Sequence, residues 1–323
     1  MAYEIDWNII FTTDGKRRRL ALLAECEVYK SVDNLADTAT IVLPELVVNE
    51  PLDFKGKIDR GTEVQIQFGY DGNLQDEFNG FVREVTVNDS SLKILCEDAL
   101  FLFRVGVPDA ELKASSLKKI SEYLVQNIDS KFKVVCDYEI TYEKFTIHAA
   151  TGYDVLKKMQ EQTKANIYFD TANSLLHIHA PYIEVGKKVY YSMQKNIETS
   201  SLEFKNKIDT KTEVTVESTD LNGNVLKKTV GTTGGDKVTI KVGNMDAESL
   251  ERVATAELAK RAAPKYEGTF DTWLEPHVAP GDSARLKDED YPDQAAFYFV
   301  QTVVSSISEG GGKRTVTPAI KLS

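Results

Sequence analysis

Apolar and polar side chains alternate along the stretch from Arg60 to Arg104. Val64, Ile66 and Phe68 form one set, and Glu63, Gln65 and Gln67 form the other. This two-residue period is that of a strand with one buried face. Two more strand-like runs follow at 78–87 and 92–96, after turn-forming residues at 69–73 and 88–91. The pattern predicts an antiparallel meander whose apolar face needs closure or a second sheet to cover it.

The rest of the N-terminal third also reads as strands. Runs rich in Ile, Leu, Val and aromatic residues span 4–11, 20–30 and 38–43. Gly80 interrupts the run at 78–87, where we expect a bulge or a close approach of another backbone. These patterns predict that residues 1–103 form a first β-barrel.

The apolar spacing changes to three and four residues beyond residue 106. Leu117, Ile120, Leu124 and Ile128 predict an amphipathic helix with Ser115 or Ser116 as its N-cap. A second helix is expected to begin at 151–154, and short strands are expected at 132–136, 145–147, 167–169 and 175–179. Residues 104–182 therefore predict a small α+β middle domain.

Strands dominate again after residue 182. A helix capped by Asp246 interrupts them at about 246–262 and ends near Pro264. We expect residues 183–323 to form a second β-barrel with this helix inserted. The predicted fold class is α+β, mainly β, with two related β-barrel domains flanking the middle domain.

An internal echo supports the idea of two related barrels. The segment 279–286 (APGDSARL) matches the opening of the alternating stretch, and Gly281 lies 220 positions after Gly61. Lys313 lies 220 positions after Lys93, and each begins the closing strand of its unit. A repeat of two units does not make a solenoid.

The alternating stretch also resembles a known family. The ordered set GTEVQIQFGYDG, FNGFVREV and CEDA is similar to the first barrel of the phage tail baseplate-hub family, which includes the late control protein D type and the hub half of type VI secretion spike proteins. The closing segment resembles the same family, with a helix before the last strands and Gly312–Lys313–Arg314 entering the final strand.

The resemblance implies a structural role. The chain is expected to form a homotrimeric ring at the distal end of a phage or phage-like tail tube, adapting the six-fold tube to a three-fold spike. It implies a tail tube protein, a separate spike protein and a tape-measure protein as partners. The resemblance places the chain in the virion tail, assembled in the bacterial cytoplasm.

Composition and charge restrict the alternatives. The 323 residues carry a formal charge of −11, which disfavours non-specific nucleic-acid binding because phosphate contacts rely on Lys and Arg. The basic run at 16–19 is interpreted as a solvated strand end. We expect no secretory signal, because MAYEIDWN lacks a basic region and an apolar run. No run of about 18 apolar residues predicts a membrane span.

Candidate chemistry is sparse. His177 and His179 form an H-x-H pair that could seed a metal site, although a structural or surface role is the favoured interpretation. Glu97–Asp98 is interpreted as a capping pair, and Asp288–Glu289–Asp290 as a solvated loop. Cys26, Cys96 and Cys136 suit small buried side chains better than disulfides. We predict no catalytic, cofactor-binding or metal-binding residues, and no enzyme.

Two other functions remain open at this point. A β-rich carbohydrate-binding or adhesion module would present exposed aromatics such as Trp7 or Trp273. A tail-associated cell-wall hydrolase would need a catalytic carboxylate pair, which no motif marks out. In a ring, we expect the polar set Glu63, Gln65 and Gln67, or its neighbours, to line an electronegative channel that a polyanion does not adhere to.

Overall fold

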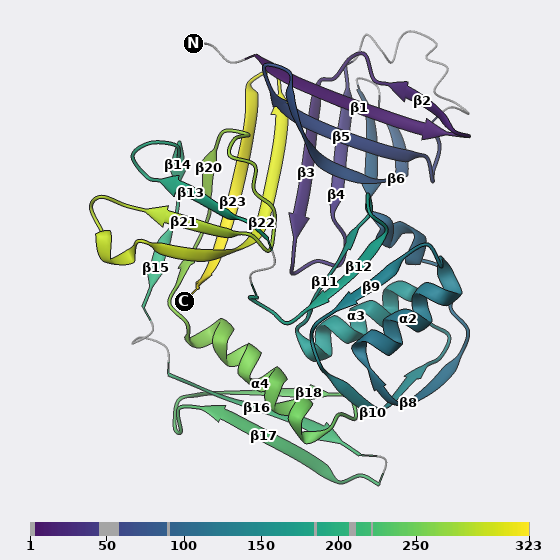
Figure 1. Ribbon diagram of the computed structural model, residues 1–323, viewed down its shortest axis with the longest axis vertical. Coiled ribbons are helices and arrows are strands. Elements are labelled where there is room, and N and C mark those ends of the chain that lie inside the picture. Colours follow the sequence, from purple (N-terminus) through teal and green to yellow (C-terminus); the bar gives the residue numbers. More distant parts are fainter. Residues whose placement is uncertain are drawn as a thin grey trace.

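The computed structural model describes residues 4–44, 58–88, 91–183, 186–206, 211–220 and 222–322. Most of the described chain is β-structure, with three α-helices gathered in its middle and lower parts (Figure 1). The predicted α+β, mainly β class is therefore confirmed.

One 15-stranded sheet runs through both ends of the chain. Its main path has the order β14-β20-β23-β22-β3-β4-β7-β6-β5-β1-β2, and β13, β15, β19 and β21 pair off this path. Its N-terminal strands alternate buried and exposed positions as the sequence predicts, with Val64, Ile66 and Phe68 buried. They are β1 (Ile5–Thr13), β2 (Lys16–Arg19), β3 (Glu25–Ser31), β4 (Thr38–Leu43), β5 (Glu63–Tyr70), β6 (Asn73–Asn88) and β7 (Ser91–Glu97).

The middle of the chain follows a short 3-10 helix, η1 (Ala99–Phe103). Two helices, α2 (Leu117–Ile128) and α3 (Gly152–Thr163), pack beside two small sheets, β10-β8 and β11-β12-β9. The strands are β8 (Ala110–Ser116), β9 (Lys133–Cys136), β10 (Thr141–Ile147), β11 (Asn166–Asp170) and β12 (Leu175–His179). Ser116 and Thr151 are the N-caps, so both predicted helix starts are confirmed.

The last part of the chain contributes to two sheets. β16 (Thr212–Thr219), β17 (Val225–Gly231) and β18 (Asp236–Val242) form a three-stranded sheet against α4 (Ala247–Ala262), whose N-cap is Asp246 as predicted. The remaining elements are β13 (Lys188–Ser192), β14 (Thr199–Ser200), β15 (Glu203–Lys205), β19 (Lys265–Glu267), β20 (Phe270–Thr272), β21 (Ser283–Lys287), η3 (Pro292–Gln294), β22 (Ala296–Ser308) and β23 (Gly311–Lys321).

The two ends of the chain do not form separate closed barrels among the described strands. β22 pairs with β3 from Thr302↔Ser31 to Ser308↔Glu25, so the edge of β3 that could close the N-terminal strands on themselves is already occupied. Instead, β1 and β5 cross over β3 and β4 at a steep angle (Figure 1), and their apolar faces share one core. The described N-terminal strands β1–β7 therefore do not close into a barrel. Instead, one continuous sheet folds over on itself, and we call this arrangement the fold-over.

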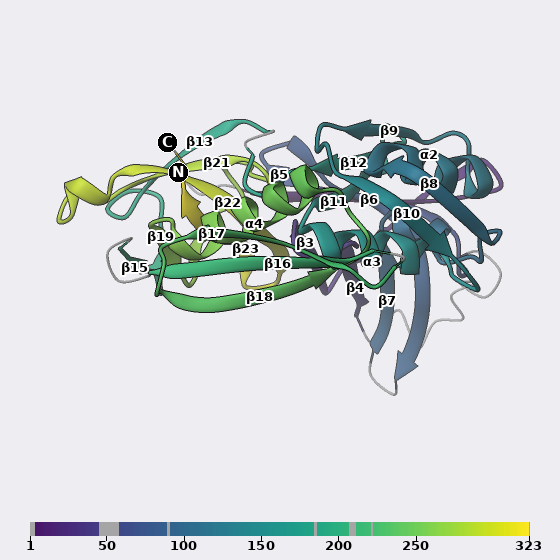
Figure 2. The same cartoon turned by 90° about the horizontal axis from the view of Figure 1, so that it is seen from below.

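The two largest hydrophobic clusters each contain residues from more than one part of the chain. The largest cluster joins α2 and α3 to Val214, Val216 and the inner face of α4, and Figure 2 shows α3 beside the ends of β16 and β18. A second cluster, inside the fold-over of β1–β7, takes in Leu274 and Ile307 from the C-terminal part. The division at 1–103, 104–182 and 183–323 stays a prediction.

The predicted internal repeat has matching local geometry. Gly61 and Gly281 both have positive φ, 92° and 89°. The Gly61 and Gly281 amides donate to the carbonyls of Val82 and Val300, at 2.8 and 2.9 Å. Thr62 and Asp282, 220 positions apart, both use a side-chain oxygen to accept from the backbone N–H three residues earlier. The two hairpins β5–β6 and β21–β22 therefore begin in the same way.

Candidate functional site: polar joints between the sheets

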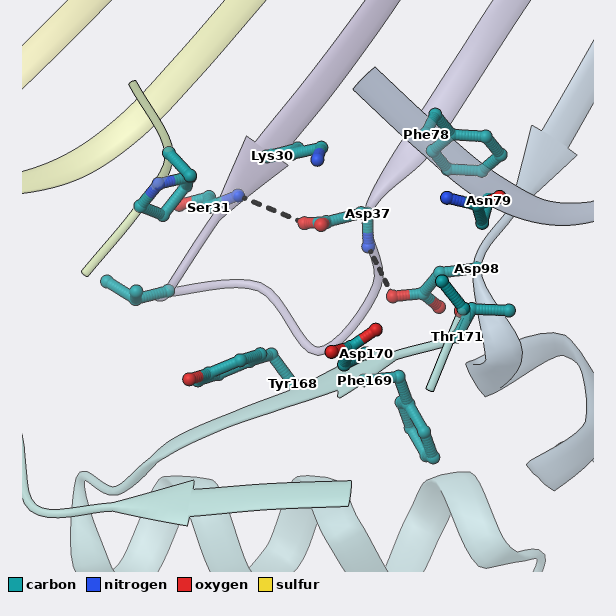
Figure 3. Close-up of a pocket in the computed structure, with 14 residues that line it drawn as sticks. Lys30, Ser31, Asp37, Phe78, Asn79, Asp98, Tyr168, Phe169, Asp170 and Thr171 are labelled. Atoms are coloured by element: carbon teal, nitrogen blue, oxygen red, sulfur yellow. Dashed lines mark hydrogen bonds between the residues drawn. The ribbon is translucent and has the colours of Figure 1, made fainter. Parts of the chain in front are cut away.

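A pocket lies where the N-terminal strands, the middle part and the loop at 279–280 meet, and Figure 3 shows its lining. The Asp98 carboxylate points towards the Asp37 backbone N–H, and the Asp37 carboxylate points towards Ser31. The Asp37 backbone N–H donates to Asp98 Oδ2 at 3.0 Å, and the Asp98 N–H donates to the Asp37 carbonyl at 3.0 Å. Asp37 Oδ1 accepts from the Ser31 N–H at 3.3 Å. This reciprocal pair ties the turn after β3 to the end of β7.

Both carboxyls of this joint have raised pKa values, so their protonation depends on the pH. Burial raises the pKa of Asp37 to about 6, although the Lys30 charge and the Ser31 N–H oppose the rise. Burial also raises the pKa of Asp98, and the neighbouring Asp37 adds to the effect. Asp37 and Asp98 do not both ionise readily, because the negative charge of each disfavours ionisation of the other.

The same joint reaches the other two parts of the chain. Asp98 caps η1 by accepting from the Leu100 N–H at 2.9 Å. The N–H of Ala99, which lies between them in sequence, donates to Thr171 Oγ1 in the β11–β12 turn at 3.0 Å. On the opposite side, Ser31 Oγ lies 2.9 Å from Thr302 Oγ1 in β22. Asp98 therefore has the predicted capping role, within a network that spans all three parts.

Glu97 makes a second polar joint next to the first. Its carboxylate accepts from Arg104 Nε at 2.9 and 3.0 Å and from the Arg104 guanidinium Nη2 at 2.6 Å. Arg104 also lies over the Tyr153 ring, 4.5 Å from its centroid, on α3. The contact with Glu97 raises the pKa of Arg104. This ion pair connects β7 to the middle helices.

A third joint, between Glu77 and Arg314, crosses the core between β6 and β23. Arg314 is fully buried, and its guanidinium donates to Glu77 Oε1, to the Pro276 carbonyl and to Ser305 Oγ. Glu77 is the extra residue of a β-bulge, since Ile66 pairs with Phe78 and Gln67 with Asp76. The bulge turns Glu77 towards the core, which an unbroken alternation would not do.

The environment of this third joint is strongly polarised. Burial raises the pKa of Glu77, and the charge on Arg314 opposes that rise. His277 lies beside the pair, and burial together with the charges of Arg314 and Lys187 lowers its pKa to about 3. His277 is therefore neutral at physiological pH, and Arg314 supplies the cation that Glu77 needs.

The predicted H-x-H pair is well ordered by its neighbours. His177 Nδ1 lies 3.2 Å from His179 Nε2, His179 Nδ1 contacts Asp137 Oδ2 at 2.7 Å, and Tyr168 stacks on His177. Burial lowers the pKa of His177. Across the described ranges, no group of three or more His, Cys, Asp or Glu side chains is placed to hold a metal. The contacts of the pair are with each other, with Asp137 and with Tyr168, and its structural role stays a prediction.

The remaining sequence candidates lie apart from the joints. Asp288 accepts from Gln194 Nε2 at 2.9 Å, and Glu289 and Asp290 are exposed at the tip of the β21–β22 hairpin. Trp273 is 47% exposed, and its indole N–H donates to Glu198. Trp7 is half-buried against the N-terminal core. Cys26, Cys96 and Cys136 are free thiols; the first two are buried as predicted, and Cys136 is half-buried.

The polar set on β5 lies on the outer face of the fold-over, as its alternation predicts. Gln65 and Gln67 both donate to Asp76 Oδ1, at 3.0 and 2.7 Å, and Arg17 donates to Gln65. Glu63 lines a cavity on the same face, beside Arg17 and Lys131. This face carries both signs of charge, and the electronegative channel stays a prediction.

Sequence reasoning missed the partners in these joints. Asp37 lies in a turn, and Glu77 follows Asp76 in a run whose register slips by one residue. In the sequence, Arg314 stands out only as part of the basic pair that enters the final strand. Glu77 stands in the polar stretch 75–77 and carries no local signal of burial, and its partner Arg314 lies 237 residues away.

The architecture matches solved phage tail structures over almost the whole chain. A tail protein from Neisseria meningitidis MC58 superposes with a TM-score of 0.69 at 16% identity, covering 97% of this chain and 96% of that one. The 43 kDa tail protein of prophage MuSo2 from Shewanella oneidensis gives 0.65 at 14% identity, covering 97% and 98%. The chain has the fold of these phage tail proteins.

A component of a secretion system also has a similar fold. The E. coli c3393 protein, a component of the type VI secretion system with structural similarity to the T4 tail proteins gp27 and gp5, gives a TM-score of 0.61 at 10% identity, covering 93% of this chain and 74% of that one. No protein-family model and no curated protein matches the chain. The predicted resemblance is therefore confirmed as a fold shared with phage tail and type VI secretion proteins.

Within the described ranges, no helix combines the length and the apolar character that crossing a bilayer requires.

Proposed function

We propose that this chain is a structural hub of a phage or phage-like tail, and that three copies form a ring adapting the six-fold tail tube to a three-fold spike. The observation that carries the proposal is the end-to-end match to a tail protein, which covers 97% of one chain and 96% of the other. The three polar joints add support, because they fasten distant parts of the chain into a rigid unit.

The proposal includes partners of three kinds. The tail tube protein lies on one side of the ring, a separate spike protein on the other, and a tape-measure protein docks within the tube. One of the similar solved structures is a Francisella PdpA–VgrG complex, which this chain matches with a TM-score of 0.57 while covering 58% of the matched chain. The buried polar side chains of the three joints pair with one another, which agrees with a structural role between other proteins.

We propose no catalytic activity for the chain. The carboxylates at Glu97, Asp98 and Glu77 are committed to caps and ion pairs, which leaves them unsuited to act as an acid–base pair. Zymography on cell-wall material tests this part of the proposal. Lysis that one carboxylate substitution abolishes would contradict it.

Native mass spectrometry and mass photometry test the ring. We expect a species at three times the 36.1 kDa chain mass, and a ring with a central opening in negative-stain images. The measurement is repeated with tube and spike proteins added. A chain that stays monomeric alone and with both partners would contradict the proposed function.

A further inference from the structure

Four consecutive basic residues form one end of the 15-stranded sheet. Among the described strands β2 pairs only with β1, so no described strand covers its other edge. Lys16, Arg17 and Arg19 are exposed, and the guanidinium contacts of Arg17 and Arg19 are 3.4 Å bonds to neutral oxygens. Arg18 Nη1 is buried without a hydrogen-bond partner. In the described part of the chain no carboxylate forms a direct ion pair with this strand, and Glu63 lines the same cavity as Arg17.

An acidic projection lies on the other side of the molecule. The tip of the β21–β22 hairpin carries Asp288, Glu289, Asp290 and Asp293, with Tyr291 57% exposed among them. In Figure 1 the hairpin, with its η3 turn, projects at the left, while β2 lies at the upper right. The hairpin of a chain therefore points away from that chain's own β2.

We propose that β2 of one copy binds the acidic hairpin tip of a second copy, in a head-to-tail contact that repeats around the ring. This inference rests on the ring proposed above and names the surfaces that form it. A heterologous interface requires two different, complementary patches on one protomer, and it forms a ring when the rotation between copies closes.

Charge complementarity identifies the occupant as a second copy of this chain. Each chain carries a formal charge of −11, so copies repel one another at long range unless opposite charges meet locally. β2 is the run of positive charge at one end of the sheet, and the hairpin tip is an exposed run of negative charge. Complementary patches of this kind steer association and fix the register of the contact.

The open edge of β2 adds a geometric argument. Short, basic edge strands protect sheets against uncontrolled strand pairing. The acidic hairpin of a second copy can approach this edge, because its charge is opposite to that of β2. The β2 strand of a second copy is repelled, because the two charges are alike. β2 thus permits the head-to-tail contact and disfavours the head-to-head one.

Charge reversal tests the contact in the full-length chain. One variant carries Arg17→Glu and Arg19→Glu, and another carries Asp290→Lys and Asp293→Lys. Each is expected to raise the concentration at which the trimer dissociates by about tenfold or more, because like charges then face each other. Raising the salt concentration is expected to weaken the wild-type trimer, because exposed charges are screened.

The combined variant and a control complete the test. A chain with all four reversals has its charges exchanged, so we expect its trimer to return to within about threefold of the wild-type dissociation concentration. The control carries Lys119→Glu and Lys237→Glu, exposed on α2 and β18, which match the charge change of the β2 variant. Circular dichroism and thermal melting confirm that each variant folds.

The outcomes separate this inference from the proposed function. A wild-type trimer that neither reversal weakens would overturn the contact and leave the ring intact. Dissociation by the β2 reversal alone would show that β2 contacts another surface of the neighbouring copy, and would also overturn the proposed contact. A wild-type chain that never assembles, even with its tube and spike partners, would remove the ring and the contact together.

Discussion

Single charged residues in this fold matter because they are buried with their partners. Arg314 has no contact with water and satisfies Glu77, Ser305 and a backbone carbonyl at once. A buried ion pair adds little net stability compared with an apolar pair, but removing one member leaves a charge without compensation. The Glu77–Arg314 joint therefore specifies how β6 and β23 meet.

Substituting Arg314 with alanine tests this view. We expect Arg314→Ala to lower the free energy of unfolding by about 3–5 kcal/mol, because Glu77 is left buried and unpaired. Lys313→Ala is the control, since Lys313 is half exposed and its ion pair with Asp271 contributes at most about 1 kcal/mol. Urea denaturation measures both. Equal losses for the two variants would show that Glu77 does not depend on Arg314.

Asp37 gives the stability a defined pH dependence. Its pKa is about 6 in the folded chain, above the value of 3.8 for a free side chain, so folding favours the protonated form. Its contribution is fully present below about pH 4 and is lost as the pH rises through 6. We expect Asp37→Asn to gain about 1–2 kcal/mol relative to wild type between pH 4 and pH 7, allowing for contact with pocket water.

The measurement compares urea unfolding of the two proteins at both pH values. The amide introduced by Asp37→Asn keeps an oxygen to accept from the Ser31 N–H, so the joint itself is retained. Removing the Asp37 charge also relieves Asp98, which acts in the same direction. A stability difference that does not change with pH would contradict the role assigned to this carboxyl.

At the scale of single elements, the sequence predicted what depends on local chemistry. Ser116, Thr151 and Asp246 accept from the N–H groups of their own first turns, so their helices could be placed from neighbouring letters alone. The bulge at Glu77 could not be placed, because it is defined by pairing with β5 rather than by any local residue. Candidate joints failed for the same reason, since their partners lie far along the chain.

Gly80 shows how tightly β6 and β7 approach each other, as its interruption of the alternation predicted. A Cβ atom at this position would lie 2.4 Å from the Glu97 carbonyl oxygen and 2.7 Å from the Phe78 ring. We expect Gly80→Ala to cost about 1–3 kcal/mol, because a backbone atom cannot rotate out of the way. Gly106→Ala is the control, because nothing lies within 4 Å of its Cβ. Thermal unfolding should separate the two variants, and matching melting temperatures would refute the close approach.

For the whole molecule, the seam between β3 and β22 unites the two ends of the chain. Leu274 and Ile307 enter the N-terminal core, and the C-terminal helix α4 packs in the core of the middle part. The sequence showed two related hairpins through Gly61 and Gly281. It could not show that their sheets merge, because alternation specifies a face and leaves the neighbouring strand undefined.

We therefore expect the isolated chain to unfold as one cooperative unit. Differential scanning calorimetry should give a single transition whose calorimetric and van't Hoff enthalpies agree, because separating the ends breaks both the seam and the shared core. A control scan at a second protein concentration identifies any contribution from assembly. Two resolved transitions would instead favour independently folding barrels.

The seam also sets a schedule for folding during synthesis. Ser31 and Thr302, which meet across it, are 271 residues apart in sequence. At about 5–20 residues per second, the ribosome delivers β22 roughly 14–54 s after β3. Contacts of such long range form slowly, so the open edge of β3 needs shielding throughout that interval. A chain released early exposes that edge permanently, which makes nascent and truncated copies natural clients for chaperones.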